Sequence, residues 1–149
     1  QLNEGIVQDY RYDYLCIEPK IVWAPSVFFE AEYKATVSCV GGGIGEDTSL
    51  DPLWEVAQRL TLSLEFHDTE FRLSGEHFYN DLSKNQHLNI WLADVSLIHK
   101  AGKWRFAASA INLFNKEQYR YTLYSAVQSY TSWIKLRPRE FMVSVQYQW

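Results

Sequence analysis

Residues 27–39, Val-Phe-Phe-Glu-Ala-Glu-Tyr-Lys-Ala-Thr-Val-Ser-Cys, alternate between apolar and polar side chains. The odd positions are apolar, and every even position after Phe28 is charged or carries a hydroxyl group. A period of two places one kind of side chain on each face of an extended chain, whereas a helix would mix the two kinds. This stretch therefore predicts a β-strand with one apolar and one polar face.

The same alternation recurs along the chain and predicts an all-β, antiparallel up-and-down fold. The last segment is as regular as the first, and five others are less pure. The seven predicted strands cover residues 15–23, 27–39, 60–66, 71–79, 91–97, 104–110 and 141–149. Strands would then form about half of the chain, far above the ~20–25% of an ordinary domain.

Composition excludes several classes of protein. The chain has 149 residues and a formal charge of -4, so it offers one domain or less and no basic surface for nucleic acid. No apolar run reaches the ~18 residues of a membrane-spanning helix. A transmembrane β-barrel stays open, because its strands look only half apolar. Cys16 and Cys39 form no CxxC pair, which leaves the disulfide state and the redox compartment undetermined.

Catalytic and metal sites have little support in the sequence. Glu30 and Glu32 could form a carboxylate pair, but with Lys34 and Arg72 nearby they fit a charge ladder lining a wet lumen better. The glycine-rich residues 41–45 lack the Lys-Ser/Thr of a phosphate loop, so a flexible loop start is the better interpretation. The histidines show no metal-ligand spacing: His67, His77, His87 and His99. We expect no enzyme activity, no metal and no cofactor.

The predicted links between strands alternate in length. Short links fall at 24–26, 67–69 and 100–103, and long links at 41–55, 80–87 and 115–135. All the short links would lie at one end of an up-and-down sheet. Outer-membrane barrels show this asymmetry, with tight periplasmic turns and longer outside loops.

Aromatic residues gather at the end with the short links. They lie on the apolar parity of their strands, where rings collect at the boundary between hydrocarbon and headgroups. The fifth predicted strand breaks the series with His99. The predicted periplasmic-side aromatic girdle consists of Trp23, Phe29, Phe66, Phe71, Trp104 and Phe106.

A soluble barrel is the alternative, because alternation alone does not say whether the apolar face points to a core or to lipid. In particular, a lipocalin-like carrier would be a complete 17.5 kDa monomer with a small apolar ligand inside. The loop asymmetry, the girdle and the charges at mid-strand on the polar face favour lipid. The odd strand count and the aromatic last residue also count against the carrier.

The C-terminal third carries a family resemblance. Residues 111–116 (INLFNK), 119–121 (YRY) and 136–145 (LRPREFMVSV) resemble the end of a TonB-dependent outer-membrane receptor of the Bacteroidota type, SusC-like or related. Residues 19–26 (PKIVWAPS) are similar to a turn between earlier barrel strands of that family. The resemblance is strong over 94–149 and weak over 41–89. Trp149 departs from the usual terminal Phe but stays aromatic.

The resemblance implies a fold and a place in the cell. Such receptors close at about 22 strands around a plugged lumen, so residues 1–149 would be the C-terminal part of the barrel domain, without the N-terminal strands and the plug. The chain would then be a fragment, or its partner segment a separate chain. Its short links would lie on the periplasmic side of the bacterial outer membrane.

The resemblance also implies a function and partners. The whole receptor would import a large solute (a glycan, iron chelate, peptide or vitamin) when the TonB complex rearranges its plug. Further partners would be the remaining barrel strands, outer-membrane lipid and, for a SusC-like receptor, a surface lipoprotein over the outside loops.

Two groups of residues are candidate sites under this interpretation. The C-terminal strand resembles the signal that the barrel-assembly machinery recognises by strand pairing, and its residues are Phe141, Val143, Val145, Tyr147 and Trp149. The last long loop is rich in aromatics that could contact the solute, or simply pack the loop onto the rim. These candidate solute contacts are Tyr119, Tyr121, Tyr124, Tyr130 and Trp133.

Overall fold

The computed structural model describes residues 2–3, 6–7, 10–44, 48–83, 86–124 and 129–149. Every regular element in these residues is a β-strand, as the alternation predicts. The described residues contain no helix that is long and apolar enough to cross a membrane.

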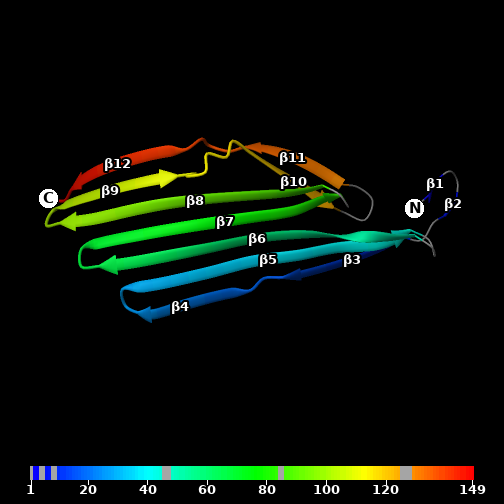
Figure 1. Ribbon diagram of the computed structural model, residues 1–149, viewed down its shortest axis with the longest axis horizontal. Coiled ribbons are helices and arrows are strands. Elements are labelled where there is room, and N and C mark those ends of the chain that lie inside the picture. The colour runs from blue at the N-terminus through cyan, green and yellow to red at the C-terminus, as the bar shows by residue number, and fades with distance from the viewer. Residues whose placement is uncertain (1, 4–5, 8–9, 45–47, 84–85, 125–128) are drawn as a thin grey trace.

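One antiparallel up-and-down sheet contains most of the strands (Figure 1). In spatial order its main path runs β12-β9-β8-β7-β6-β5-β3, and β4 also pairs with β5. The bounds are β3 Tyr10–Ile17, β4 Lys20–Ser26, β5 Phe29–Ile44, β6 Thr48–Phe66, β7 Thr69–Ser83, β8 Gln86–Ala101, β9 Trp104–Ile111 and β12 Glu140–Tyr147. Two separate hairpins pair β1 (Leu2–Asn3) with β2 (Ile6–Val7), and β10 (Gln118–Tyr124) with β11 (Ser129–Lys135).

The sheet has eight strands where the sequence pattern predicts seven. The first predicted strand is divided into β3 and β4, and both pair with β5. The interruption falls at Glu18 and Pro19, because a proline has no N–H for the ladder. The Pro19 carbonyl still accepts a hydrogen bond from the Ala35 N–H at 3.0 Å, which keeps the broken strand against β5.

The long links predicted at 41–55 and 80–87 are mostly paired strand. β5 and β6 continue pairing as far as Ile44 and Thr48, and β7 and β8 as far as Ser83 and Gln86. The glycine-rich segment is therefore not a flexible loop start. A Cβ on Gly42 would collide with the backbone carbonyl of Arg11 in β3, so glycine permits a close approach of two strands there.

The short links are tight two-residue turns, and all three lie at one end of the sheet. The residues that flank them pair directly: Ser26 with Phe29, Phe66 with Thr69, and Ala101 with Trp104. Gly102 has a φ of 59° and His67 a φ of 51°, the left-handed conformation that such turns require. Figure 1 shows these turns opposite the end where β10 and β11 lie.

The sheet is not closed within the described residues, since β12 pairs only with β9, and β3 and β4 only with β5. Its buried apolar residues are few and small to medium in size: Ala35, Ile90 and Ala110. Large apolar side chains stay exposed, as at Val143, which is 80% exposed. Among the described residues the eight-stranded sheet is thus a single layer without an enclosed core.

Candidate functional site

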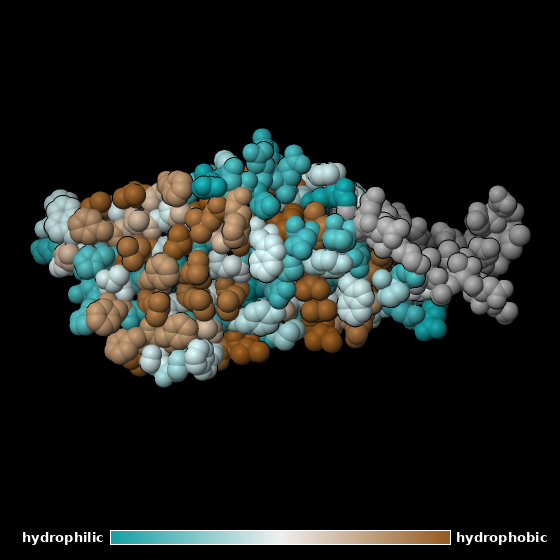
Figure 2. All heavy atoms as spheres, viewed as in Figure 1, coloured by the Kyte–Doolittle hydropathy of each residue, from teal (hydrophilic) through white to brown (hydrophobic). Residues whose placement is uncertain are grey.

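The strand register gathers the apolar residues on one face of the sheet, here called the apolar face. The line of partners through Trp23 runs Ala31, Leu62, Leu73, Val95, Ala110 and Phe141. Figure 2 shows this face, with hydrophobic side chains spread over the sheet and hydrophilic ones at its margins and in a band across its middle. The parity assigned from the sequence therefore agrees with the register across the seven strands that this line crosses.

All six residues of the predicted girdle lie on the apolar face, at the end with the tight turns. Several of their rings touch: Trp23 and Phe29 have centroids 5.5 Å apart, and Trp104 and Tyr147 4.8 Å apart. His99 fills the gap on β8, where its Nδ1 lies 2.9 Å from the Thr69 hydroxyl. The six girdle residues, His99 on β8, Tyr147 and Trp149 are together called the turn-side belt.

The candidate assembly residues of β12 share the apolar face. Phe141, Val143 and Val145 are 73%, 80% and 54% exposed. One edge of β12 pairs with β9, and in the described residues no strand pairs with the other edge. This strand therefore presents both an apolar face and backbone groups available for pairing.

Charged side chains of the central strands lie on the opposite face, here called the polar face. Glu32 pairs with Lys34 at 2.6 Å and with Lys20 at 3.1 Å, and Arg59 pairs with Glu76. Arg72 pairs with Glu70 of its own strand at 2.9 Å. The charge ladder expected from the sequence is thus present around Glu32.

One row of polar side chains crosses the apolar face. The Tyr33 hydroxyl donates to Gln58 Oε1 at 2.7 Å, and Gln58 Nε2 lies 2.8 Å from His77 Nδ1. His77 Nε2 lies 2.9 Å from Asn89 Oδ1, and its ring stacks on Trp91 with centroids 4.2 Å apart. This row joins four neighbouring strands, and the sequence pattern alone does not show it.

The apolar face also carries aromatic residues near the ends of the long hairpins. Trp54, Tyr79 and Trp91 have apolar-face parity on β6, β7 and β8, and Trp54 and Trp91 are 43% and 53% exposed. Sequence analysis missed this second set because it placed residue 54 in a loop. Extending the apolar alternation of the strand at 60–66 back from Leu60 to Trp54 would have indicated that Trp54 lies on the apolar face.

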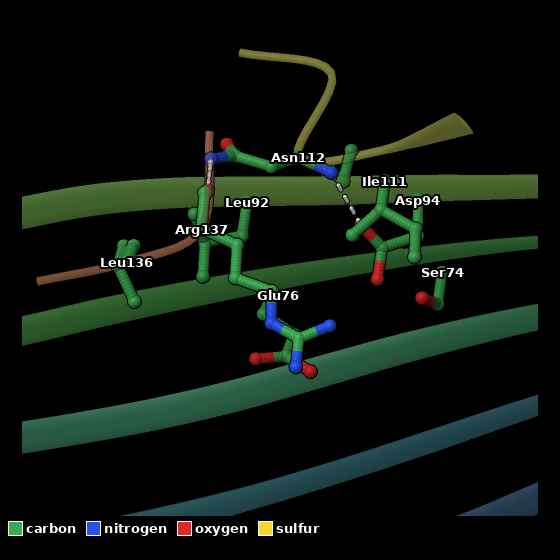
Figure 3. Close-up of a pocket in the computed structure, with 9 residues that line it drawn as sticks. Ser74, Glu76, Leu92, Asp94, Ile111, Asn112, Leu136 and Arg137 are labelled. Atoms are coloured by element: carbon green, nitrogen blue, oxygen red, sulfur yellow. Dashed lines mark hydrogen bonds between the residues drawn. The ribbon is translucent and has the colours of Figure 1, made fainter. Parts of the chain in front are cut away.

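The family-like motif at residues 112–115 forms a compact junction. Asn112 is 5% exposed and has a φ of 54°. Its Nδ2 donates to the backbone carbonyls of Lys116 and Arg137 at 2.8 Å each, and its Oδ1 accepts from the Lys116 N–H at 2.9 Å. Its own N–H donates to Asp94 Oδ1 at 2.8 Å (Figure 3). These contacts, which we call the Asn112 junction, tie the end of β9 to the segment that leads into β12.

A cavity of about 150 Å³ lies beside this junction on the polar face. Its lining combines apolar side chains with the charged side chains of Glu76, Asp94 and Arg137 (Figure 3). Its lining includes Ser74, Leu92, Ile111 and Leu136.

The β10–β11 hairpin occupies the predicted long loop at 115–135 and separates the candidate solute contacts. Tyr119 packs against Phe78 of the polar face, with ring centroids 5.2 Å apart. Trp133 pairs with Arg120 on the other hairpin face, and Tyr130 has the parity of Tyr119. The side chains of Tyr121 and Tyr124 lie outside the described part. The five predicted contacts therefore do not form one surface.

Cys16 and Cys39 are both free thiols, and the register places them on opposite faces of the sheet. Among the described residues, no group of three or more His, Cys, Asp or Glu side chains could hold a metal ion. Comparisons with protein-family models, with curated proteins and with solved structures found no match for this chain.

Proposed function

We propose that this chain forms the C-terminal part of the wall of a TonB-dependent receptor barrel in a bacterial outer membrane. The whole receptor would import a large solute, with the plug and the TonB complex supplying the driven step. The apolar face would contact lipid, and the polar face would line the lumen.

The slant of the turn-side belt is the observation that carries this proposal. The register line through Trp23 reaches β12 at Phe141, whereas the belt residue on β12 is Tyr147. The belt thus slips six residues, about 20 Å, over six strand spacings of about 4.8 Å. If the belt lies level in a membrane, the strands are tilted by about 35°, within the ~35–45° of transmembrane barrels.

The spacing between the two aromatic sets agrees with a bilayer. On β7, Phe71 and Tyr79 are eight residues apart, and on β6, Phe66 and Trp54 are twelve apart. At about 3.3 Å per residue and this tilt, the two sets are separated by about 22–32 Å along the membrane normal. The apolar band of outer-membrane barrels is about 25 Å tall.

The distribution of charged residues also supports a lipid-facing role for the apolar face. No residue that the register places on the apolar face between the two aromatic sets is Asp, Glu, Lys or Arg. The ion pair of Arg11 and Asp13 has apolar-face parity, but it lies opposite Gly43 and Gly41, beyond the second aromatic set. A lipid-facing surface requires this, because a charge in hydrocarbon is costly.

The two open edges of the sheet would need partner strands in a membrane. An unpaired backbone group costs several kcal/mol in hydrocarbon, so both edges must pair with other strands in a membrane. The remaining barrel strands of the receptor would supply these partners. The free edge of β12 would first pair with the barrel-assembly machinery by β-augmentation.

Heat-modifiability of the native protein tests the proposal. Outer membranes are probed with an antibody to residues 115–135, on gels of boiled and unboiled samples. We expect a band far larger than 17.5 kDa that migrates faster when unboiled. A 17.5 kDa band in the outer membrane would indicate a split barrel. The same band in the soluble fraction alone would refute the membrane role and favour the lipocalin-like carrier.

A further inference from the structure

The β10–β11 hairpin has one face that the sheet does not cover. Tyr119 lies against Phe78 at the ends of β7 and β8, so the hairpin face with Tyr119 is turned toward the polar face of the sheet. In Figure 1 the hairpin crosses behind these strands, on the side away from the apolar face. The register places the alternate residues on the opposite side, here called the outer hairpin face. It comprises Gln118, Arg120, Thr131, Trp133 and Lys135.

This outer hairpin face is cationic in an acidic chain. The chain has a net charge of -4, yet the five residues include two cations and no Asp or Glu. The Arg120 guanidinium carbon lies 5.1 Å from the centre of the Trp133 ring. Arg120 Nε is buried and has no hydrogen-bond partner in the structure. An anion is the natural complement of such a surface.

Trp133 adds a flat apolar surface next to this charge. Its side chain is 64% exposed although one side of the ring faces Arg120. An exposed indole offers a flat apolar surface on which a ring can stack. A ring that stacks on indole while its attached oxyanion meets a planar guanidinium would satisfy both residues together.

We propose that the outer hairpin face binds a carboxylate carried on a ring with an apolar face, as in uronic-acid sugars and aromatic acids. Trp133 stacks on the ring, the terminal guanidinium nitrogens of Arg120 donate to the carboxylate, and Lys135 attracts the charge. This inference rests on the proposed function in one respect, since it assigns the ligand to the imported solute.

Ligand binding to the full-length protein, purified from its native membrane in mild detergent, tests this assignment. The calorimetric probes are trigalacturonate, the neutral sugar maltotriose, and salicylate as an aromatic acid. Arg120→Gln and Trp133→Leu should each weaken binding of the carboxylate probe by about 10-fold to 100-fold, the loss expected for a charge-assisted hydrogen bond or a stacked ring. The matched control, Lys116→Gln on the adjacent turn, removes a cation outside the outer hairpin face and should bind as the parent protein does.

The probes separate the two sources of the carboxylate. Tighter binding of trigalacturonate than of salicylate assigns a uronic-acid sugar, and the reverse order assigns an aromatic acid. Maltotriose binding as tightly as the preferred carboxylate probe, or an Arg120→Gln variant no weaker than Lys116→Gln, would overturn the proposal.

Failure of this inference is distinguishable from failure of the proposed function. A heat-modifiable outer-membrane protein that binds neither carboxylate probe overturns the ligand assignment and leaves the membrane role intact. A protein found only in the soluble fraction that binds them through Arg120 supports the site and refutes the membrane role.

Discussion

Removal of the Asn112 side chain should loosen the start of the C-terminal strand by a defined amount. Asn112→Gly keeps a residue that tolerates the φ of 54° but deletes three side-chain hydrogen bonds of 2.8–2.9 Å. Each such bond contributes a net ~0.5–1.5 kcal/mol, so the local loss should be about 2–4 kcal/mol. Asn112→Ala should lose about 1 kcal/mol more, because a Cβ disfavours the left-handed conformation.

Amide hydrogen exchange, read by mass spectrometry, measures this local opening. The reporting amides are those of Leu113, which donates to the Ala93 carbonyl at 2.8 Å, and Leu136, which donates to the Glu117 carbonyl at 3.0 Å. A loss of about 2–4 kcal/mol should accelerate their exchange by about 30-fold to 1,000-fold. Amides in the β5–β6 ladder should exchange at the parent rate.

Asn115→Gly is the matched control for this experiment. Asn115 also has a left-handed φ, of 51°, but the structure gives its side chain one hydrogen bond, from the Arg139 N–H at 2.9 Å. Its loss should accelerate exchange by only about 2-fold to 13-fold. If Asn112→Gly exchanged no faster than Asn115→Gly, the junction would not stabilise the approach to β12, and this reasoning would be refuted.

Three further outcomes are expected. Gly42→Val should detach β3 from β5, because its Cβ would meet the Arg11 carbonyl. Limited proteolysis checks this, since new cleavage is expected near residues 10–17. The control Gly75→Val, where a Cβ meets nothing within 4 Å, should show no such cleavage. If the sheet spans a membrane as proposed, Val143 lies about 11 Å above Tyr147 and near the midplane, so Val143→Lys should reduce the stability of the barrel in lipid by about 2–4 kcal/mol. Ser144→Lys on the polar face should cost far less, and equal losses would contradict the assignment of faces. In bilayers with brominated acyl chains, the fluorescence of Trp91 and Trp104 should be quenched most by bromines near the headgroups. Strongest quenching by mid-chain bromines would refute the interfacial position of the two aromatic sets.

The period-two pattern was sufficient to predict the strands of the main sheet and their faces, but it did not predict the β10–β11 hairpin, which lies in the predicted link at 115–135. Polar residues such as Glu30, Glu32 and Lys34 cannot share a side with Phe29 and Ala31 in any extended chain, so the faces follow directly from the sequence. The tight turns were also predictable, because His67-Asp68 and Gly102 carry turn chemistry.

Strand ends were predicted poorly because hydrogen-bond ladders do not depend on alternation. The residues 41–44 pair with β3 and β6 although three glycines interrupt the pattern. Only the approach of the Arg11 carbonyl explains why glycine is required at position 42. Tertiary proximity of this kind leaves no local signal, which is also why the contacts of Asn112 with Asp94 and Arg137 could not be foreseen from spacing.

The polar row on the apolar face is compatible with lipid because of its hydrogen bonding and its height. Gln58 Oε1 accepts from the Tyr33 hydroxyl, which leaves the Gln58 amide nitrogen to donate to His77 Nδ1 and His77 Nε2 to donate to Asn89 Oδ1. Measured from the turn-side belt on each strand, the row rises from about 11 Å at Tyr33 to about 27 Å at Asn89. In the proposed membrane orientation its open end reaches the headgroup level, where the remaining amide protons of Asn89 can meet water. A row that is bonded within the apolar band and open only at its boundary avoids the cost of unsatisfied polar groups in hydrocarbon.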